Sequence, residues 1–182
     1  MKSAKKILAL ILAGVMALAL LTGCGKATSL NRTIAEGLAV SAKSFLAGRG
    51  NTNNISVSYQ VPELSRDIAP LFDENWITQD NEGHDVLNEN YKVNGNKTVE
   101  GILTDVILRH YMFTARVKFA AADVTDVKTP FMEVENLLDS RIGFSGTDPS
   151  LADTSITSLK VAVTHKTVNG RTYALVMIIC EA

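Results

Sequence analysis

The pattern that most constrains the fold lies near the C-terminus, where two stretches rich in apolar residues flank Asn169-Gly170. Asparagine followed by glycine accepts the positive φ angles of a type I′ turn, which joins two antiparallel strands through a two-residue loop. The sequence therefore predicts a β-hairpin with strands over residues 159–168 and 171–180. Counting outward from the turn pairs His165 with Ala174, Val163 with Val176, and Val161 with Ile178.

The two predicted strands differ on the opposite face of the hairpin. There the first strand carries Lys160, Thr164 and Lys166, whereas the second strand carries Ile179, Leu175 and Tyr173. A strand that is apolar on both faces is typical of the middle of a sheet, and a strand with one polar face can be half exposed. We therefore expect the final strand to be central in a mainly antiparallel sheet, with the helices over one face.

Two stretches show the spacing of apolar residues that is typical of amphipathic helices. The first follows Thr33-Ile34-Ala35-Glu36, which has the form of a capping box, and it reaches the glycines at 48 and 50. The second covers residues 98–113, with apolar positions at Val99, Ile102, Leu103, Val106 and Ile107. An N-terminal helix and a long central helix packed on the sheet make an α+β fold.

Weaker patterns predict the remaining elements. Residues 55–61 alternate as a half-buried strand, Pro70 can open a short helix that reaches Ile77, and residues 79–85 form a loop. Thr129-Pro130 is the predicted start of a short amphipathic helix that ends before Gly143. Residues 114–127 fit either a continuation of the central helix or a strand.

The N-terminus has the architecture of a signal peptide. Lys2, Lys5 and Lys6 precede an apolar run over residues 7–21, which is shorter than the roughly 20 residues that a membrane span needs. Leu21-Thr22-Gly23-Cys24 then resembles the lipobox of bacterial lipoproteins position by position. The resemblance implies cleavage before Cys24 and a diacylglyceryl thioether on its sulfur. The alternative is an ordinary secretory signal with an incidental cysteine.

The lipobox divides the chain into a signal peptide (1–23), a lipidated cysteine with a short tether (24–32) and a single α+β domain (33–182). Removal of the signal leaves 159 of the 182 residues, enough for one hydrophobic core. That length is too small for the two closing lobes of a solute-binding receptor. Because the tether is short, we expect the domain to lie close to the extracytoplasmic face of the membrane.

The net charge limits the classes of partner that the chain can bind, and the cysteine content limits its thiol chemistry. The mature chain has fifteen basic and nineteen acidic residues, a formal charge of −4, which argues against nucleic acid as a partner. We expect attachment to the cell membrane through the lipid, and a protein, cell-wall or small-molecule partner nearby. Cys180 lies in an apolar run, which predicts a buried, unreactive thiol. No pattern calls for a cofactor.

The three histidines are the candidates for proton transfer or metal binding. His110 and His165 lie beside apolar residues, where a structural role is the commoner one. His84 lies in an acidic stretch whose oxygen atoms could bind a divalent cation, together with Asp80, Glu82, Asp85 and Glu89. The order of these residues departs from the EF-hand loop, and a solvated acidic loop is the other interpretation.

Motifs of known enzymes give little support for catalysis. The sequence has no G-x-S-x-G elbow, no H-E-x-x-H and no phosphate-binding loop, and Glu133 and Glu135 do not share a helical face. Asn136-Leu137-Leu138, Ile142-Gly143 and the Asn169-Gly170 turn resemble the end of secreted CAP-type domains, but that family's paired histidines and glutamates are missing. The sequence favours a non-catalytic binding or assembly module. The alternative is a small envelope enzyme, a hydrolase or a CAP-like domain.

Overall fold

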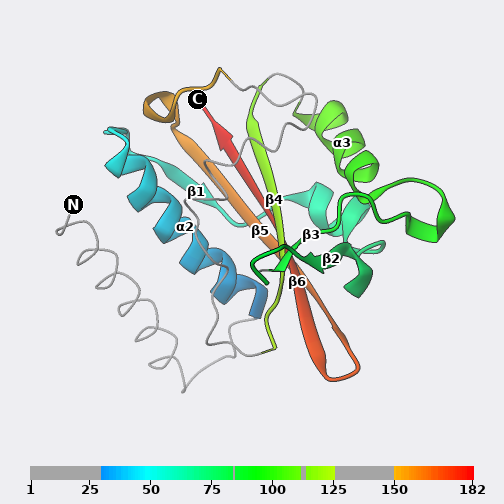
Figure 1. Ribbon diagram of the computed structural model, residues 1–182. Helices are drawn as coiled ribbons and strands as arrows, with labels where there is room; N and C mark the ends of the chain where they lie inside the picture. Colours follow the sequence, from blue (N-terminus) through cyan, green and yellow to red (C-terminus); the bar gives the residue numbers. More distant parts are fainter. Residues whose placement is uncertain (1–29, 84, 112–113, 126–149) are drawn as a thin grey trace.

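A computed structural model describes residues 30–83, 85–111, 114–125 and 150–182 (Figure 1). Cys24, His84 and the predicted helix that starts at Thr129 lie outside these described residues, and so do Glu133, Glu135 and the CAP-like residues 136–143. The regular elements in chain order are α2 (Leu30–Gly48), β1 (Ser56–Ser58), η1 (Leu64–Ile68), η2 (Glu74–Trp76), β2 (Ile77–Gln79), β3 (Asp85–Leu87), η3 (Val93–Gly95), α3 (Val99–His110), β4 (Arg116–Asp123), η4 (Asp153–Ser155), β5 (Ser158–Val168) and β6 (Arg171–Glu181).

The fold is α+β and is built on a four-stranded sheet in the order β1-β5-β6-β4. β5 and β4 are antiparallel to β6, whereas the short β1 runs parallel to β5. The predicted hairpin is confirmed in its register, because His165 faces Ala174, Val163 faces Val176 and Val161 faces Ile178. Asn169 and Gly170 adopt φ angles of 52° and 81°, as the turn requires. The central position of the last strand is also confirmed.

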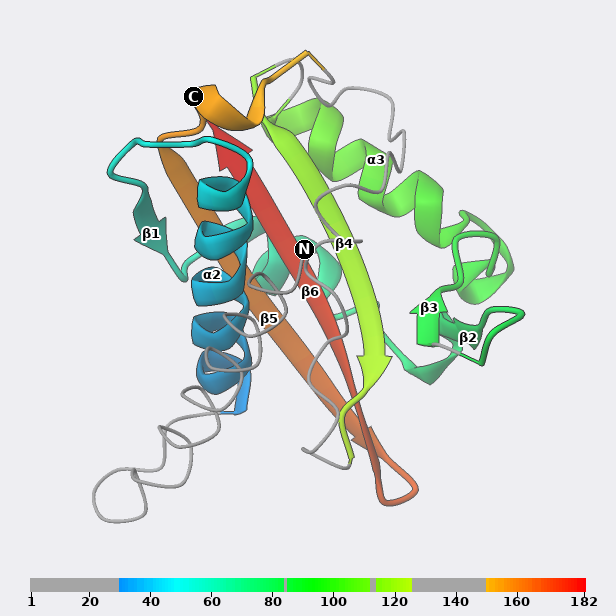
Figure 2. The same ribbon diagram turned by 60° about the vertical axis from the view of Figure 1, so that its left-hand side comes forward.

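The prediction that the helices cover one face of the sheet is wrong. Helix α2 packs on one face and helix α3 on the other, which the two views of the ribbon show (Figures 1 and 2). The physical reason lies in β6, where every residue from Ala174 to Cys180 is buried. A strand that is apolar on both faces needs cover on both, so the two helices divide the sheet between them.

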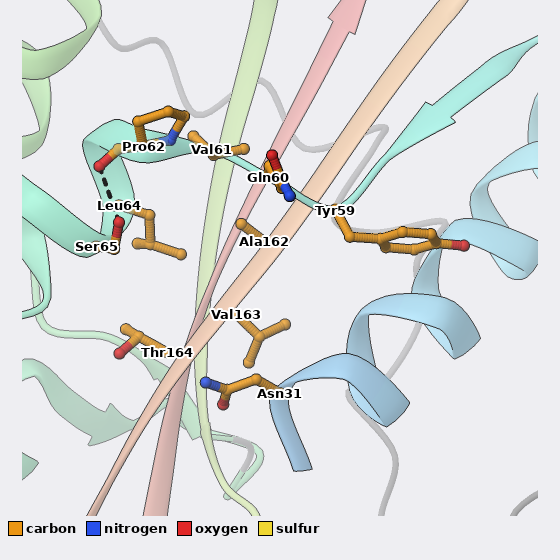
Figure 3. Close-up of a pocket in the computed structure, with 10 residues that line it drawn as sticks. All are labelled: Asn31, Tyr59, Gln60, Val61, Pro62, Leu64, Ser65, Ala162, Val163 and Thr164. Atoms are coloured by element: carbon orange, nitrogen blue, oxygen red, sulfur yellow. Dashed lines mark hydrogen bonds between the residues drawn. The ribbon is translucent and has the colours of Figure 1, made fainter. Parts of the chain in front are cut away.

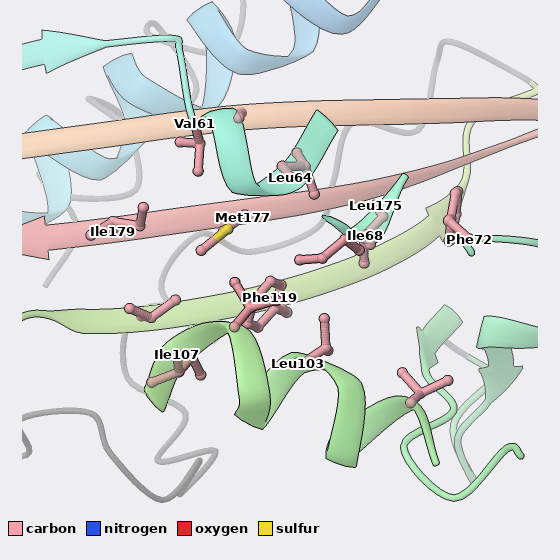
Figure 4. Close-up of a cluster of buried hydrophobic side chains, with 14 of the residues drawn as sticks. Val61, Leu64, Ile68, Phe72, Leu103, Ile107, Phe119, Leu175, Met177 and Ile179 are labelled. Carbon is pink, nitrogen blue, oxygen red and sulfur yellow. The ribbon is translucent and has the colours of Figure 1, made fainter. Parts of the chain in front are cut away.

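On the α3 face, a single apolar cluster joins α3 and η1 to the sheet. Phe119 of β4 and Met177 of β6 pack against Leu103 and Ile107 of α3, with Ile68 of η1 beside them (Figure 4). The helix begins where its cap predicts, since Thr98 Oγ1 accepts a hydrogen bond from the Gly101 amide at 3.1 Å. The predicted central helix is therefore confirmed, although it ends at His110.

Helix α2 starts earlier than its capping box predicts. The helix already runs at Leu30, so Thr33 lies inside the helix and is not its N-cap. Glu36 does not complete a capping box, because its carboxylate pairs with Arg32 Nε one turn earlier, at 2.6 Å. Helix α2 thus includes Leu30, Asn31 and Arg32, which the sequence assigned to the tether.

Three of the weaker predictions need correction. The strand predicted over 55–61 shortens to Ser56–Ser58, and the helix predicted after Pro70 is replaced by η1 before it and η2 after it. The predicted loop at 79–85 is the tip of a β2–β3 hairpin, whose strands contribute Gln79 and Asp85. Within the ambiguous stretch at 114–127, Arg116–Asp123 forms strand β4, because its alternate apolar side chains bury against β6 and α3.

Candidate functional site

The candidate site lies along the outer edge of β5, where the sheet lacks a strand. Strand β1 pairs with β5 at Ser158, Leu159 and Lys160 and then leaves the sheet after Ser58. Strand β5 continues to Val168, so most of its length has β6 on one side and no strand of the described residues on the other. An unpaired strand edge presents backbone N–H and C=O groups that can bind another chain.

The register identifies which backbone groups face outward. Residue pairs along an antiparallel ladder alternate between those that exchange hydrogen bonds and those that do not, and Val168 and Arg171 form the bonded pair that closes the two-residue loop. Val163, His165 and Thr167 therefore direct their N–H and C=O groups away from β6. Among the described residues no hydrogen bond reaches these six groups. The β6 residue Thr172 supports this register, since its backbone bonds on the β4 side.

A hollow of about 420 Å³ lies along this edge (Figure 3). Its floor is Ala162, Val163 and Thr164 of β5, and Asn31 at the start of α2 forms one side. The chain that leaves β1 and enters η1 forms the other side, with Tyr59, Gln60, Val61, Pro62, Leu64 and Ser65. We call these ten residues the edge groove.

Three contacts between neighbouring elements hold the two sides of the edge groove in place. The guanidinium of Arg32 lies 3.8 Å from the ring centroid of Tyr59, which joins α2 to the chain after β1. Asn31 Oδ1 and His165 Nδ1 form a hydrogen bond of 2.6 Å, which joins α2 to β5. Further along, Lys166 Nζ donates to the carbonyl of Phe72 at 3.3 Å. The walls therefore come from segments that are far apart in the sequence.

The chemistry of the edge groove is neutral. The described residues that line it carry amide and hydroxyl groups from Asn31, Gln60, Ser65, Thr164 and Tyr59, and none of them is an acid, a lysine, an arginine or a histidine. Such a lining can donate and accept hydrogen bonds and can contact apolar groups. It offers no acid–base pair and no nucleophile–base pair, so binding is the chemistry that it supports.

His84 lies outside the described residues, so the metal site suggested around it stays a prediction. In the described part of the chain, no group of three or more histidine, cysteine, aspartate or glutamate side chains could hold a metal ion. Asp80 accepts the amide of Glu82 within its own turn at 2.9 Å, and Asp85 accepts the amide of Asp123 in β4 at 2.7 Å. Because these carboxylates bind backbone groups of different elements, their closeness in sequence does not make them one cluster.

A second group of polar residues joins α3 to η1. His110 is partly exposed, and its ring nitrogens lie 3.9 Å from Glu63 Oε1 and 3.8 Å from Asp67 Oδ2. Tyr111 donates its hydroxyl to Glu63 Oε2 at 2.8 Å, and burial followed by this bond raises the pKa of Tyr111 above its ordinary value. Hydrogen bonds from Arg66 hold the pKa of Asp67 below its usual range. None of these residues lines the edge groove.

Cys180 is buried and free, which confirms the prediction of an enclosed thiol. Burial raises its pKa from 9.0 to about 11, with Arg116 acting in the opposite direction. The unfolded thiol therefore loses its proton at lower pH than the folded one, so the free energy of unfolding should fall as pH rises from 9 to about 11. A shift of this size corresponds to about 2–3 kcal/mol over that interval.

Urea unfolding at a series of pH values would measure this effect. We expect the fall between pH 9 and about 11 to be clearly smaller in Cys180→Ala, in which the thiol is absent, although Tyr111 still titrates. Equal falls in the two proteins would show that the thiol does not carry the dependence.

Comparison with known proteins provides no relative, because no family model matches the chain and no curated protein or solved structure is significantly similar to it. Across residues 30–83, 85–111, 114–125 and 150–182, none of the helices has the length and apolar character needed to cross a membrane.

No pattern in the sequence predicts the edge groove as a whole. Its one local signal was Pro62, which interrupts the alternation of residues 55–61 and cannot donate a ladder hydrogen bond. Nothing in the sequence placed Asn31 beside Val163, because that neighbourhood exists only once α2 has packed on β5.

Proposed function

We propose that the chain is a membrane-anchored extracytoplasmic lipoprotein whose α+β domain is a non-catalytic binding module. The observation that carries the proposal is the edge groove, a hollow with neutral polar and apolar walls beside an unpaired strand edge. The lipobox-like residues that end at Cys24 support the anchoring, and the described lining, which has no acid, lysine, arginine or histidine, supports binding over catalysis.

The position of the edge groove suits a partner near the membrane. Asn31, which lines the groove, follows Cys24 after six intervening residues, a reach of about 25 Å when fully extended. A diacylglyceryl group holds a protein on a bilayer far more stably than one acyl chain does. A lipidated Cys24 would therefore keep the groove within a few nanometres of the membrane surface, where it can meet membrane or envelope components.

The alternative is a small envelope enzyme, and one observation favours it. His110 lies between the carboxylates of Glu63 and Asp67, an arrangement that can orient a histidine for proton transfer. A hydrolase of this kind would turn over model esters and would lose that activity in His110→Gln. The CAP-like version gains no support from the edge groove, whose described lining has no histidine or glutamate.

The anchoring part of the proposal predicts that Cys24→Ser changes the location of the protein. The wild-type chain should sediment with membranes and carry an acyl mass. The membrane-bound fraction of the variant should fall about tenfold or more, because residue 24 no longer has a sulfur to lipidate. Cys180→Ser is the matched control and should stay with the membrane. Fractionation followed by mass spectrometry provides both readouts, and equal retention of Cys24→Ser would contradict the anchor.

The binding part is tested by a photo-crosslinking residue at Gln60, which is exposed on the rim of the edge groove. Thr78 on β2 is also exposed and does not line the groove, so it is the control position. In cells that produce the lipoprotein, we expect a crosslinked species from Gln60 and none from Thr78. If neither position yields an adduct, or both yield the same one, the groove is not a binding site.

A further inference from the structure

We propose that the occupant of the edge groove is an extended segment of another polypeptide, which adds to the sheet as a strand beside β5. The inference rests on the proposed binding role of the groove and names its partner class. Three consecutive outward positions, Val163, His165 and Thr167, present N–H and C=O groups that have no partner among the described residues. An extended backbone is the ligand that matches such a row of groups.

The sheet already accepts a strand at this edge. β1 binds β5 in parallel register over Ser158–Lys160, and the Ser56 amide donates to the carbonyl of Thr157 at 2.9 Å. After Ser58 the chain turns away toward η1, and the position that a fourth or fifth residue of β1 would occupy becomes the edge groove. A bound segment would thus continue the line of β1, over about 17 Å from Ala162 to Thr167.

The walls define the chemistry of that segment. Within the lining, Val163 and Tyr59 belong to the apolar cluster on the α2 face of the sheet, and Leu64 and Ala162 belong to the cluster on the α3 face. Because successive side chains of a strand point to opposite faces, both sets of side chains of the bound segment would meet partly apolar walls. The described lining carries no charge, so the central residues of the segment should be uncharged.

Protection of the edge also changes along β5. Natural sheets use charged side chains to keep other strands from exposed edges, and on β5 the charged residue near the hairpin turn is Lys166. The part inside the edge groove, Ala162 to Thr164, has no such residue. Binding would therefore begin at Ala162 to Thr164, and it can extend to His165 and Thr167 because the Lys166 amine is already bonded to the carbonyl of Phe72.

The test uses the full lipidated chain in detergent micelles and a display library of random peptides. A peptide selected on the wild-type chain is synthesised, and its affinity is measured for two variants at one position. His165→Pro removes one outward N–H and is compatible with an edge strand, whereas His165→Ala removes the same side chain and keeps that N–H. We expect the proline variant to bind the peptide about tenfold or more weakly than the alanine variant does, because both variants lose the imidazole and they differ in the outward N–H.

Hydrogen exchange gives a second readout that a merely structural effect would not produce. On peptide binding, the amides of Val163, His165 and Thr167 should become protected, while those of Thr164 and Lys166, which bond to β6, should change little. If His165→Pro does not fold, as judged by circular dichroism, Thr167→Pro and Thr167→Ala replace that pair at the next outward position.

Three results would overturn the proposal. The first is that the library yields no peptide that binds. The second is that a selected peptide binds His165→Pro as tightly as wild type, and the third is that the chain dimerises through this edge and excludes peptides. Each is distinct from failure of the proposed function. An adduct of small mass at Gln60, without any peptide binder, would keep the groove as a binding site and reject the peptide as its occupant.

Discussion

Replacement of Phe119 with alanine is expected to lower the free energy of unfolding by about 3–5 kcal/mol. The ring is 1% exposed and packs in the cluster that joins β4 to α3 and to β6, so its removal leaves a cavity between a helix and the sheet. Neighbours such as Leu103 and Met177 are themselves fully enclosed and can relax only in part. Chemical denaturation of the wild-type protein and of Phe119→Ala measures the difference in their free energies of unfolding.

Phe45 on α2 is the matched control, because it is also a phenylalanine but is only partly buried. Its ring contacts sheet residues on one side, while the guanidinium of Arg49 lies 5.0 Å from its centroid. We expect Phe45→Ala to cost clearly less, about 1–2 kcal/mol. If the two alanine variants lose the same stability, the cluster under α3 is not the densely packed part of the molecule.

Asn51→Ala is expected to lower the free energy of unfolding by about 2–4 kcal/mol. Although Asn51 lies in a polar turn, its side chain is buried, and its amide donates to the carbonyls of Asp153 at 2.6 Å and Ile156 at 2.9 Å. Its Oδ1 also accepts the amide of Asn53 at 2.8 Å. Alanine would leave these groups with fewer partners, away from water.

Asn53→Ala tests whether burial is the cause. Asn53 donates to the carbonyl of Ile156 at 3.0 Å and to that of Thr154 at 2.9 Å, but it is exposed, so water can replace its bonds. We expect a loss of no more than about 1 kcal/mol. Thermal and urea unfolding of both variants would measure the two losses of stability. A larger loss for Asn53→Ala than for Asn51→Ala would contradict burial as the cause.

The parts of the fold that sequence analysis predicted correctly are those with local causes. Asn169 and Gly170 determine a turn whose geometry sets the register of both strands, so every pair from Val168 to Leu159 follows from two residues. The α3 helix carries its own N-cap at Thr98 and its own apolar stripe. Burial of Cys180 likewise followed from the apolar run around it.

The predictions that failed needed information about distant contacts. Thr33 and Glu36 match a capping box, but Glu36 pairs with Arg32 in a helix that already runs at Leu30. The strand over 55–61 ends after Ser58, where the chain leaves the sheet for η1.

The sequence by itself determined the hairpin, the two helices, the class of fold and the candidate lipidation signal, since each depends on residues within one turn or one strand of each other. Only the tertiary structure decided that the helices lie on opposite faces and that β5 keeps an open edge. The physical reason is that a groove forms between elements. Asn31, Gln60 and Val163 become neighbours only after apolar burial has brought α2 and η1 onto the sheet.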